Sequence, residues 1–451
     1  PERRPGRRRA VTGRPELRHF RVYRVARIAG AVLRALPAYA WLLLRAKLGR
    51  PGDDAAWTRV HERTAARVDR LVERLGGIPI KFAQIAGARG DLFPEPWVRR
   101  MRRYHDAVPP RPLDELRPAL ERDLGRALED VFAEVEEPAL AAASIAQVHG
   151  ARLRDGRRVV LKIQYPEIAR IAPVDLTTGR AVSRLVSRLS GSDLRTFVRE
   201  MTRFVGLELD FAREADSTER VASELAGTGL ARVPEVHRAW CGPRLLVLER
   251  LDGIPITDVA ALRAAGHDPG ELAARVARLY AAMIFEHGFF HGDPHPGNLL
   301  VLRDGTLGLL DFGLCKELPP GFGRKAAALV AAALAGDAAA TLRAAGELGF
   351  DVRRVEPEAA LALVGMLLGR ARPEGSPVFP LLLRRNPLAT IPEDVALVVR
   401  TLVLLTGLSH ALAPGEGRVQ QELARVIVPL LRETAPATPE RATATAGAPA
   451  A

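Results

Sequence analysis

The chain has 451 residues, of which 47% are hydrophobic and 26% are charged. This composition excludes collagen, coiled coil and disorder as the main state, and the length predicts two to three folding units. The net charge of +13 is uneven, because the first fifty residues hold fourteen basic and two acidic residues, a net of +12, which leaves +1 for the rest. This nearly neutral body argues against nucleic-acid binding. Two cysteines, Cys241 and Cys315, are too few for a disulfide framework, so an intracellular protein is expected.

The basic N-terminal arm, residues 1–50, is expected to lie at a membrane surface. Its first part, 1–19, is rich in Arg and Pro and is expected to be disordered, and a helix is predicted over 20–36. The apolar run Ala35–Leu44 is ten residues long, too short to span a bilayer. A basic helix followed by an aromatic and apolar segment favours peripheral attachment to an anionic membrane at its inner face; the alternative is a docking helix with a solvated basic face. The basic residues placed on one face of the helix are Arg24, Arg27 and Arg34.

Beyond the arm, helices are predicted over 54–75 and 111–130, and the pattern changes near residue 138. Short β-branched runs then predict strands, and long helical patterns lie between and after them. The apolar stretch 395–408 contains Arg400 and is predicted to be a buried helix. The predicted strands are Arg158–Ile163, Leu245–Leu248, Asn298–Leu302 and Leu307–Leu310.

The strongest local signal is the segment His291–Asn298, which reads His-Gly-Asp-Pro-His-Pro-Gly-Asn. Thirteen residues after Asn298, the sequence Asp-Phe-Gly begins at Asp311. This spacing is typical of the catalytic and metal-binding loops of kinase folds. Asp293 is predicted to accept a proton or orient the nucleophile, while Asn298 and Asp311 are predicted to hold Mg²⁺ against the nucleotide phosphates.

Lysine is rare in this chain, since only five of the 66 basic residues are lysines. A lysine that persists in such an arginine-rich sequence is a candidate for chemistry that a planar guanidinium cannot perform. Lys162 lies in a predicted strand, where a kinase fold places the lysine that binds the α- and β-phosphates. No G-x-G-x-x-G strap precedes it, and no Walker sequence occurs anywhere, which excludes a P-loop NTPase. The five lysines of the chain are Lys47, Lys81, Lys162, Lys316 and Lys325.

Together these residues resemble the AarF/UbiB family of atypical kinases, which is tied to isoprenoid-quinone metabolism, over roughly 54–425 of the chain. The family's K-x-G-Q motif is matched by Lys81–Gln84, with Ala83 in place of Gly. Its Ala-rich loop is matched by Ala141–His149, where Ala146 stands at a position often occupied by Gly. The two replacements raise the question of how closely a nucleotide approaches the loop.

The resemblance also implies roles for particular residues. The E-x-D motif is matched by Glu208 and Asp210, which Lys81 is expected to face, with Gln84 on the same helix face. The glutamate that pairs with Lys162 is matched by Glu214. The implied nucleotide-binding residues are Ala141, Ala142, Ala143, Ser144, Ile145, Ala146, Gln147, Lys162 and Glu249.

The fold implied is α+β, an atypical protein-kinase-like fold of two lobes with an N-terminal helical extension. The implied cofactors are ATP or ADP and Mg²⁺, and the expected partners are an anionic membrane or isoprenoid lipid and lipid-modifying enzymes. Hydrolysis of ATP, or phosphorylation of a small molecule or lipid, fits better than protein phosphorylation, because no Ala-Pro-Glu segment follows Asp311. The predicted segments are a membrane-peripheral arm over 1–50, the extension over 51–137, the β-containing N-lobe over 138–252, the helical C-lobe over 253–432 and a disordered tail over 433–451.

Two alternatives remain open. A small-molecule phosphotransferase of the aminoglycoside or choline kinase type shares the His-Gly-Asp, Asn and Asp pattern, although the Lys81 and Ala141–His149 segments argue against it. A nucleotide-binding scaffold without catalytic activity is the second, although the chain keeps every group expected to bind phosphate and Mg²⁺.

Overall fold

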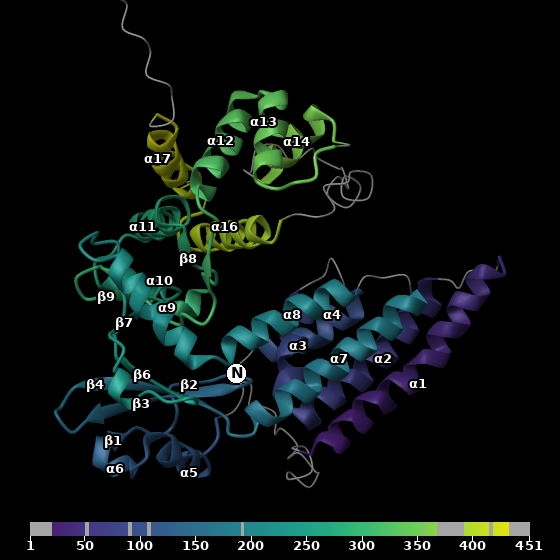
Figure 1. Cartoon of the computed structure of the whole chain (residues 1–451), viewed down its shortest axis with the longest axis horizontal. Helices are drawn as coiled ribbons and strands as arrows, with labels where there is room; N and C mark the ends of the chain where they lie inside the picture. The colour runs from purple at the N-terminus through teal and green to yellow at the C-terminus, as the bar shows by residue number, and fades with distance from the viewer. Residues whose placement is uncertain are drawn as a thin grey trace, which may run out of the picture. The chain divides into compact units, whose positions relative to one another are not determined.

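The computed structural model describes residues 20–49, 54–88, 93–105, 110–190, 194–353, 355–367, 392–414 and 418–432. The chain forms two compact units (Figure 1). The first comprises Pro1–Arg220, Pro234–Leu251 and Asp311–Leu314, and the second comprises the remaining residues. The predicted disordered segments 1–19 and 433–451 lie outside the described residues.

The first unit contains a group of packed helices. The link between α2 and α3 is a pair of glycines, Gly76 and Gly77, with φ of 58° and 61°, a conformation that other residues rarely adopt. A buried cluster that includes Val72, Ala83 and Met101 joins α2, α3 and α4. These helices are α1 (Arg21–Lys47), α2 (Asp54–Leu75), α3 (Ile78–Ala88), α4 (Glu95–Met101), α7 (Ile168–Ser190) and α8 (Leu194–Glu208).

The same unit contains an antiparallel sheet in the order β1-β3-β4-β6, with β2 beside β3. Alternation along β4 buries Val159, Leu161 and Ile163, so Lys162 lies on the opposite face. The strands are β1 (Phe132–Val135), β2 (Ala141–Ala142), β3 (Ala146–Leu153), β4 (Arg158–Gln164) and β6 (Leu245–Glu249), accompanied by helices α5 (Leu113–Leu124) and α6 (Leu128–Val131). Helix α9 (Phe211–Glu224) belongs to this unit as far as Arg220.

The second unit is mainly helical and contains two small sheets, β5-β10-β9-β7 and β11-β8. The hairpin β9–β10 turns at Gly305, whose φ is 80°. The strands are β5 (Ala231–Arg232), β7 (Gly253–Pro255), β8 (Phe289–His291), β9 (Leu299–Leu302), β10 (Leu307–Leu309) and β11 (Cys315–Glu317). The α-helices are α10 (Val259–Ala264), α11 (Pro269–Ala281), α12 (Phe322–Ala335), α13 (Ala338–Glu347), α14 (Pro357–Leu367), α16 (Glu393–Leu412) and α17 (Arg418–Arg432).

Most predicted elements are present, and three differ. The helix predicted over 111–130 is two helices, because Gly125 ends α5 with a φ of 70°. The helix predicted over 20–36 continues through Pro37 to Lys47 and forms the single 27-residue α1. The helix predicted to be buried over 395–408 is part of α16, which exposes Val403.

Helix α1 requires a further correction. By length and composition alone, α1 and α16 could each cross a membrane, although core helices of soluble proteins also meet this criterion. The uncharged run Ala35–Leu44 is still ten residues long, and a longer apolar window of α1 includes at least one of the flanking arginines. Arg24, predicted to share one basic face with Arg27 and Arg34, is fully buried and pairs with Asp175 of α7. The prediction of one shared basic face is therefore wrong for Arg24, because Arg24 is buried against α7 whereas Arg34 is exposed.

Candidate functional site

Lys162 is held between two carboxylates of the first unit. Its Nζ donates to Glu214 Oε1 at 2.6 Å and to Asp311 Oδ1 at 3.1 Å. Glu214 lies in the first turn of α9 and is 1% exposed, whereas the Asp311 side chain is half-exposed. The expected pairing of Lys162 with Glu214 is thus present, and Asp311 shares the same ammonium group.

The turn that carries Asp311 is tightly built. Asp311 has a φ of 56° and is the one non-glycine residue at positive φ among those described. Such conformations cost free energy and concentrate at functional sites. The Gly313 N–H donates to Asp311 Oδ1 at 3.2 Å, and a side-chain carbon at Gly313 would lie 3.4 Å from Glu214 Oε2. Gly313 therefore allows the turn to approach both carboxylates closely.

Burial and charge set the protonation of this cluster. Burial raises the pKa of Glu214 to about 7; Lys162 opposes this rise, and the negative charge of Asp311 adds to it. For Lys162, burial opposes the charged form, but Asp311 and Glu214 outweigh it and raise the pKa of the ammonium well above its ordinary value. Lys162 is therefore held in its charged form, whereas burial favours the neutral form of Glu214.

A second ion pair lies beside this cluster. Lys81 of α3 pairs with Glu208 at the end of α8, as the resemblance implied, and both side chains are about one quarter exposed. Asp210, the other expected partner, caps α9, because its Oδ1 accepts from the Arg213 N–H at 3.0 Å. The Gln84 amide donates to the Tyr104 carbonyl at 2.9 Å and so joins α3 to the segment after α4. The structure therefore pairs Lys81 with one of its two expected acids.

The Ala-rich loop forms a tight turn between β2 and β3, in which the Ala143 N–H donates to the Ala146 carbonyl at 2.8 Å. Ile145 and Ala146 are part of the buried core, and Ser144 is buried as well. The Gln147 side chain is 1% exposed and binds the backbone N–H and carbonyl of Arg111. Of the seven loop residues expected at the nucleotide, only the segment Ala141–Ala143 is partly or fully exposed.

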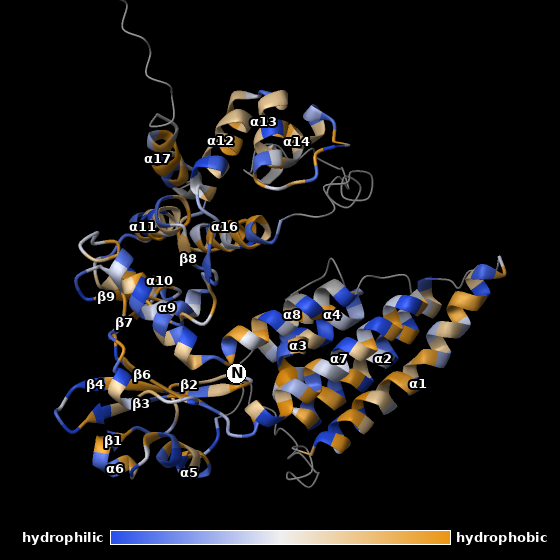
Figure 2. Cartoon of the chain, viewed as in Figure 1, coloured by the Kyte–Doolittle hydropathy of each residue, from blue (hydrophilic) through white to orange (hydrophobic). Residues whose placement is uncertain are grey.

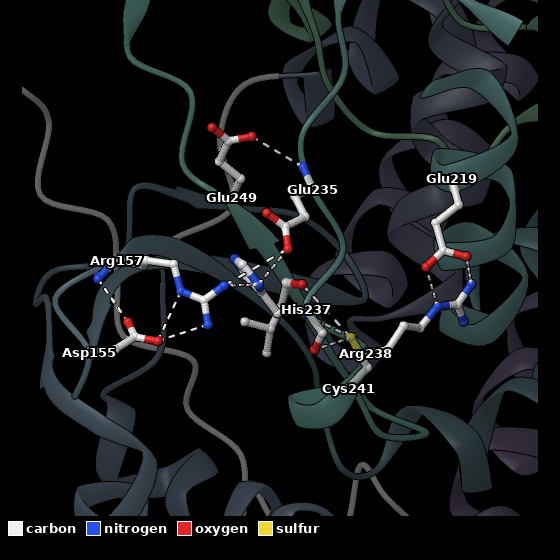
Figure 3. A network of polar contacts seen from close by, with 9 residues as sticks. Asp155, Arg157, Glu219, Glu235, His237, Arg238, Cys241 and Glu249 are labelled. Carbon is white, nitrogen blue, oxygen red and sulfur yellow. Dashed lines mark hydrogen bonds and ion pairs between the residues drawn. The ribbon is translucent and has the colours of Figure 1, made fainter. Parts of the chain in front are cut away.

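Glu249, implied to bind the nucleotide, ends β6 and belongs to a surface network (Figure 3). Its Oε2 accepts from the Glu235 N–H at 3.3 Å. In the same network the Arg238 guanidinium donates to both carboxylate oxygens of Glu219, at 2.7 and 2.8 Å (Figure 3). Because Glu219 lies on α9 with Glu214, this network braces the helix that holds Lys162.

In the second unit, buried polar contacts of His291 hold the start of the His291–Asn298 motif in place. His291 is fully buried, and its ring contacts the Tyr280 hydroxyl at 3.1 Å and the Leu310 carbonyl at 3.2 Å. The Asn298 amide donates to the Asp293 carbonyl at 3.2 Å, which leaves the amide oxygen of Asn298 available as a ligand. The Asp293 carboxylate is 37% exposed and lies 3.7 Å from Arg400 Nη2.

Two contacts of the first unit were not anticipated from the sequence. The Arg213 guanidinium donates to the Gly313 carbonyl at 3.1 Å, which ties α9 to the Asp-Phe-Gly turn. Lys162 Nζ lies 5.6 Å from the centre of the buried Phe211 ring, within the range of a cation–π interaction. Arg213 and Phe211 lie beside Asp210 and Glu214, the acids that the resemblance singles out, and no motif in the sequence marks them.

Each unit contains an oxygen ligand of a kind that suits Mg²⁺ arriving with a nucleotide. Among the described residues, no three His, Cys, Asp or Glu side chains cluster closely enough to hold a metal by themselves. Mg²⁺ bound to a nucleotide needs only one or two protein oxygens, because phosphates and waters supply the rest. The half-exposed Asp311 carboxylate and the Asn298 amide oxygen are ligands of the required kind. In addition, Glu214 Oε2 is buried and finds no hydrogen-bond donor among the described residues.

Comparison with known proteins supports the assignment of these motifs. The ABC1 atypical kinase-like domain matches residues 103–345, more than half of the chain. Probable protein kinase UbiB of Pseudomonas paraeruginosa (strain DSM 24068 / PA7) is 35% identical over 270 residues, which cover 59% of this chain and 51% of that protein. AarF domain-containing kinase 1 of Drosophila melanogaster is 33% identical over 308 residues, which cover 67% of this chain and 60% of that protein. The matched region thus spans about half to three-fifths of these relatives' own length.

A solved structure shows the fold. The complex of Rv3197 with erythromycin from Mycobacterium tuberculosis has a TM-score of 0.54 and 22% identity, and the match covers 85% of this chain and 99% of that one. This likeness concerns the fold alone, and it confirms the predicted α+β kinase-like fold. With the family match over residues 103–345 and the two motifs described above, the chain belongs to the ABC1 atypical kinase-like family, which includes the AarF and UbiB proteins.

Proposed function

We propose that this chain is an ATP-dependent atypical kinase or ATPase that supports isoprenoid-quinone or related lipid metabolism at a membrane surface. The observation that carries the proposal is the position of Lys162 Nζ between Glu214 at 2.6 Å and Asp311 at 3.1 Å. A phosphate-binding lysine must be charged and held in place, and this arrangement does both. The AarF and UbiB relatives are named as kinases, which supports the same chemistry.

In this proposal each residue has a defined task. Lys162 binds the α- and β-phosphates of ATP, and Asp311 and Asn298 hold the Mg²⁺ that, when bound, neutralises phosphate charge. Asp293 takes the proton of the attacking hydroxyl, from water or from an acceptor. The oxygen of that hydroxyl bonds to the γ-phosphorus while the bond from the γ-phosphorus to the β,γ-bridging oxygen breaks, and ADP leaves with the electron pair.

The acceptor is proposed to be water, a small molecule or a lipid rather than a protein. Only β11 and a short turn separate the Asp-Phe-Gly segment from α12, which begins at Phe322. This leaves little chain for a peptide-docking platform of the kind that protein kinases build after that segment. The Lys81–Glu208 ion pair of the first unit further restrains the region beside Glu214.

Membrane contact is assigned to the outer face of α1. This helix packs on α7 and α2 through its inner face, yet several of its apolar side chains are exposed. Figure 2 shows apolar residues recurring along the helix. A fully buried Arg24 on the inner face favours a helix that lies in the plane of the membrane surface rather than across it. Arg27, Arg34 and Arg45, spaced by seven and eleven residues, form a basic row beside the apolar face. The exposed apolar residues are Val22, Val25, Leu33, Trp41, Leu44 and Leu48.

The proposal is tested by replacing Asp311 with Asn, which removes one charge from the expected metal site and keeps its shape. Mg²⁺-dependent ATP turnover is expected to fall by at least about 100-fold, because phosphate neutralisation dominates this catalysis. Stabilisation of the protein by Mg·ADP in a thermal unfolding assay should fall in parallel. Unchanged turnover and unchanged stabilisation would overturn the assignment.

A further inference from the structure

Helix α16 lies outside the region matched by the family, 103–345, yet it contacts the catalytic loop of the second unit. Thr401 is fully buried, and its hydroxyl donates to the Gly292 carbonyl at 3.5 Å. The neighbouring residue, Arg400, places Nη2 3.7 Å from Asp293 Oδ1. Two consecutive residues of one helix therefore meet two consecutive residues of the His-Gly-Asp sequence.

The same helix is anchored at its first turn. Lys316 Nζ lies 2.7 Å from Asp394 Oδ1, and the two side chains are 23% and 26% exposed. Lys316 belongs to β11, which pairs with β8, the strand that leads directly into the catalytic loop. Asp394 and Thr401 are seven residues apart and so lie on the same face of α16. The Lys316–Asp394 pair thus fixes the helix against the small sheet from which the loop emerges.

The electrostatics of the Arg400 contact favour orientation over stability. At 3.7 Å the two groups form an ion pair without a direct hydrogen bond, and the side chains of Arg400 and Asp293 are 47% and 37% exposed. Pairs this exposed contribute little to folding stability. A fixed positive charge beside a carboxylate nevertheless favours one direction of that carboxylate. A change at Arg400 should therefore affect the catalytic step more than unfolding.

We propose that Arg400 is a positioning residue that orients the carboxylate of Asp293, with α16 held in place by Lys316 and Thr401. This inference rests on the proposed function, because it assigns Asp293 the role of accepting a proton. Arg400 acts through Asp293 and is not required for nucleotide binding. A cation supplied by a helix beyond the matched region would thus set the efficiency of the family's catalytic loop in this chain.

The test measures kcat and KM for Mg·ATP in the full chain for Arg400→Gln, Arg400→Lys, Asp293→Asn and the double variant Arg400→Gln/Asp293→Asn. Val403→Ala serves as the matched control, since Val403 lies three residues further along α16 and is 60% exposed. Arg400→Gln should lower kcat about 10-fold with KM within about twofold of wild type, as expected when the catalytic step is impaired and substrate binding is unchanged. Arg400→Lys should restore at least about a third of kcat, since the charge is kept. In the Asp293→Asn background, Arg400→Gln should cause no further loss, because residues that act as a unit are not additive.

The outcomes separate the inference from the proposed function. A wild-type protein without Mg·ATP turnover, or an Asp293→Asn variant as active as wild type, would overturn the proposed function and the inference together. If Asp293→Asn is impaired but Arg400→Gln matches the Val403→Ala control, the inference alone is wrong. A further loss of activity in the double variant, equal to that in the single variant, would show that Arg400 acts independently of Asp293 and would also overturn the inference.

Discussion

Arg24 and Asp175 form a buried bidentate ion pair between α1 and α7, in which Arg24 Nε lies 2.7 Å from Asp175 Oδ1. The same guanidinium donates to the Leu75 carbonyl at 2.8 Å and to the Gly76 carbonyl at 3.4 Å. These carbonyls lie at the end of α2, just before the turn that leads into α3 and Lys81. Arg24 therefore connects the N-terminal helix to the base of the helix that carries the Lys81 motif.

This pair predicts that the N-terminal arm contributes to folding. Arg24→Met should lower the free energy of unfolding by roughly 3–5 kcal/mol, because the Asp175 carboxylate remains buried without its partner. Arg34→Met, at an exposed position of the same helix, should change it by no more than about 0.5 kcal/mol. Denaturant unfolding of the two variants measures the difference.

The double variant Arg24→Met/Asp175→Leu distinguishes the charge effect from lost packing. It should be more stable than Arg24→Met alone, because no unpaired buried charge remains. Equal stability of Arg24→Met and Arg34→Met would contradict the role given to Arg24. For the same reason, deletion of residues 1–48 should strongly destabilise the protein, because it removes Arg24 and leaves Asp175 buried.

Glu214 predicts a pH dependence. Burial raises the pKa of Glu214 to about 7, so below this pH the carboxyl is neutral in the folded protein and cannot pair with Lys162 as an anion. Mg·ATP binding and turnover should therefore rise as the pH increases through about 7. The folded state binds the proton more tightly than the unfolded state, so this group also lowers stability as the pH rises from its ordinary carboxyl range towards 7.

The control is Glu214→Gln, which keeps the shape of the side chain and removes its titration. Its activity should be lower at pH 8 and should lack the rise near neutral pH, and its unfolding free energy should vary less between pH 5 and pH 7.5 than that of wild type. Buffers of matched ionic strength keep surface charge effects constant. A rise of unchanged position in Glu214→Gln would assign the titration to another group.

The sequence predicted the fold where patterns were long. The apolar alternation of Arg158–Ile163 is long enough to specify β4, and the hairpin of β9 and β10 is marked by a turn glycine. Strands of two or three residues, such as β5 and β8, carry no periodicity that could separate them from loops. The resemblance, rather than periodicity, selected Glu214 among three neighbouring acids.

Ion pairs between residues far apart in the chain could not be predicted from the sequence. Arg24 and Asp175 are 151 residues apart, and helical periodicity groups Arg24 with Arg27 and Arg34 without indicating which one is buried. In the same way, Arg400 was noted only as a charge in an apolar stretch. Neither contact follows from local propensity, because each depends on how distant helices pack.

Lys162 and Lys81, two lysines of the first unit, should have different functional roles. Lys162→Ala removes the cation shared by Glu214 and Asp311 and should weaken Mg·ADP binding by about 10- to 100-fold, the range for a lost charged hydrogen bond. Lys81→Ala breaks the pair with Glu208 and should leave Mg·ADP affinity within about twofold of wild type while allowing self-phosphorylation. Lys325→Ala, at an exposed position of α12, is the matched lysine control.

Calorimetric titration with Mg·ADP and mass spectrometry after incubation with Mg·ATP measure the two effects. Lys81→Ala that matches the Lys325→Ala control in both assays would reduce Lys81 to a structural residue. Equal loss of affinity in Lys81→Ala and Lys162→Ala would place Lys81 in the nucleotide site itself.

The exposed face of α1 predicts how the protein meets a membrane. Trp41 is 60% and Leu44 is 48% exposed on a helix whose inner face is already covered. Trp41→Ser/Leu44→Ser should weaken sedimentation with anionic vesicles by at least about 10-fold, since a buried apolar side chain of this size contributes about 1.5–3 kcal/mol.

Replacing Arg27, Arg34 and Arg45 by Gln should weaken vesicle binding chiefly at low salt, because each surface cation contributes about 1 kcal/mol. Leu334→Ser, at a 42% exposed leucine of α12, is the control for a general loss of surface apolarity. The assignment of α1 would be wrong if Trp41→Ser/Leu44→Ser and Leu334→Ser bound the vesicles equally well.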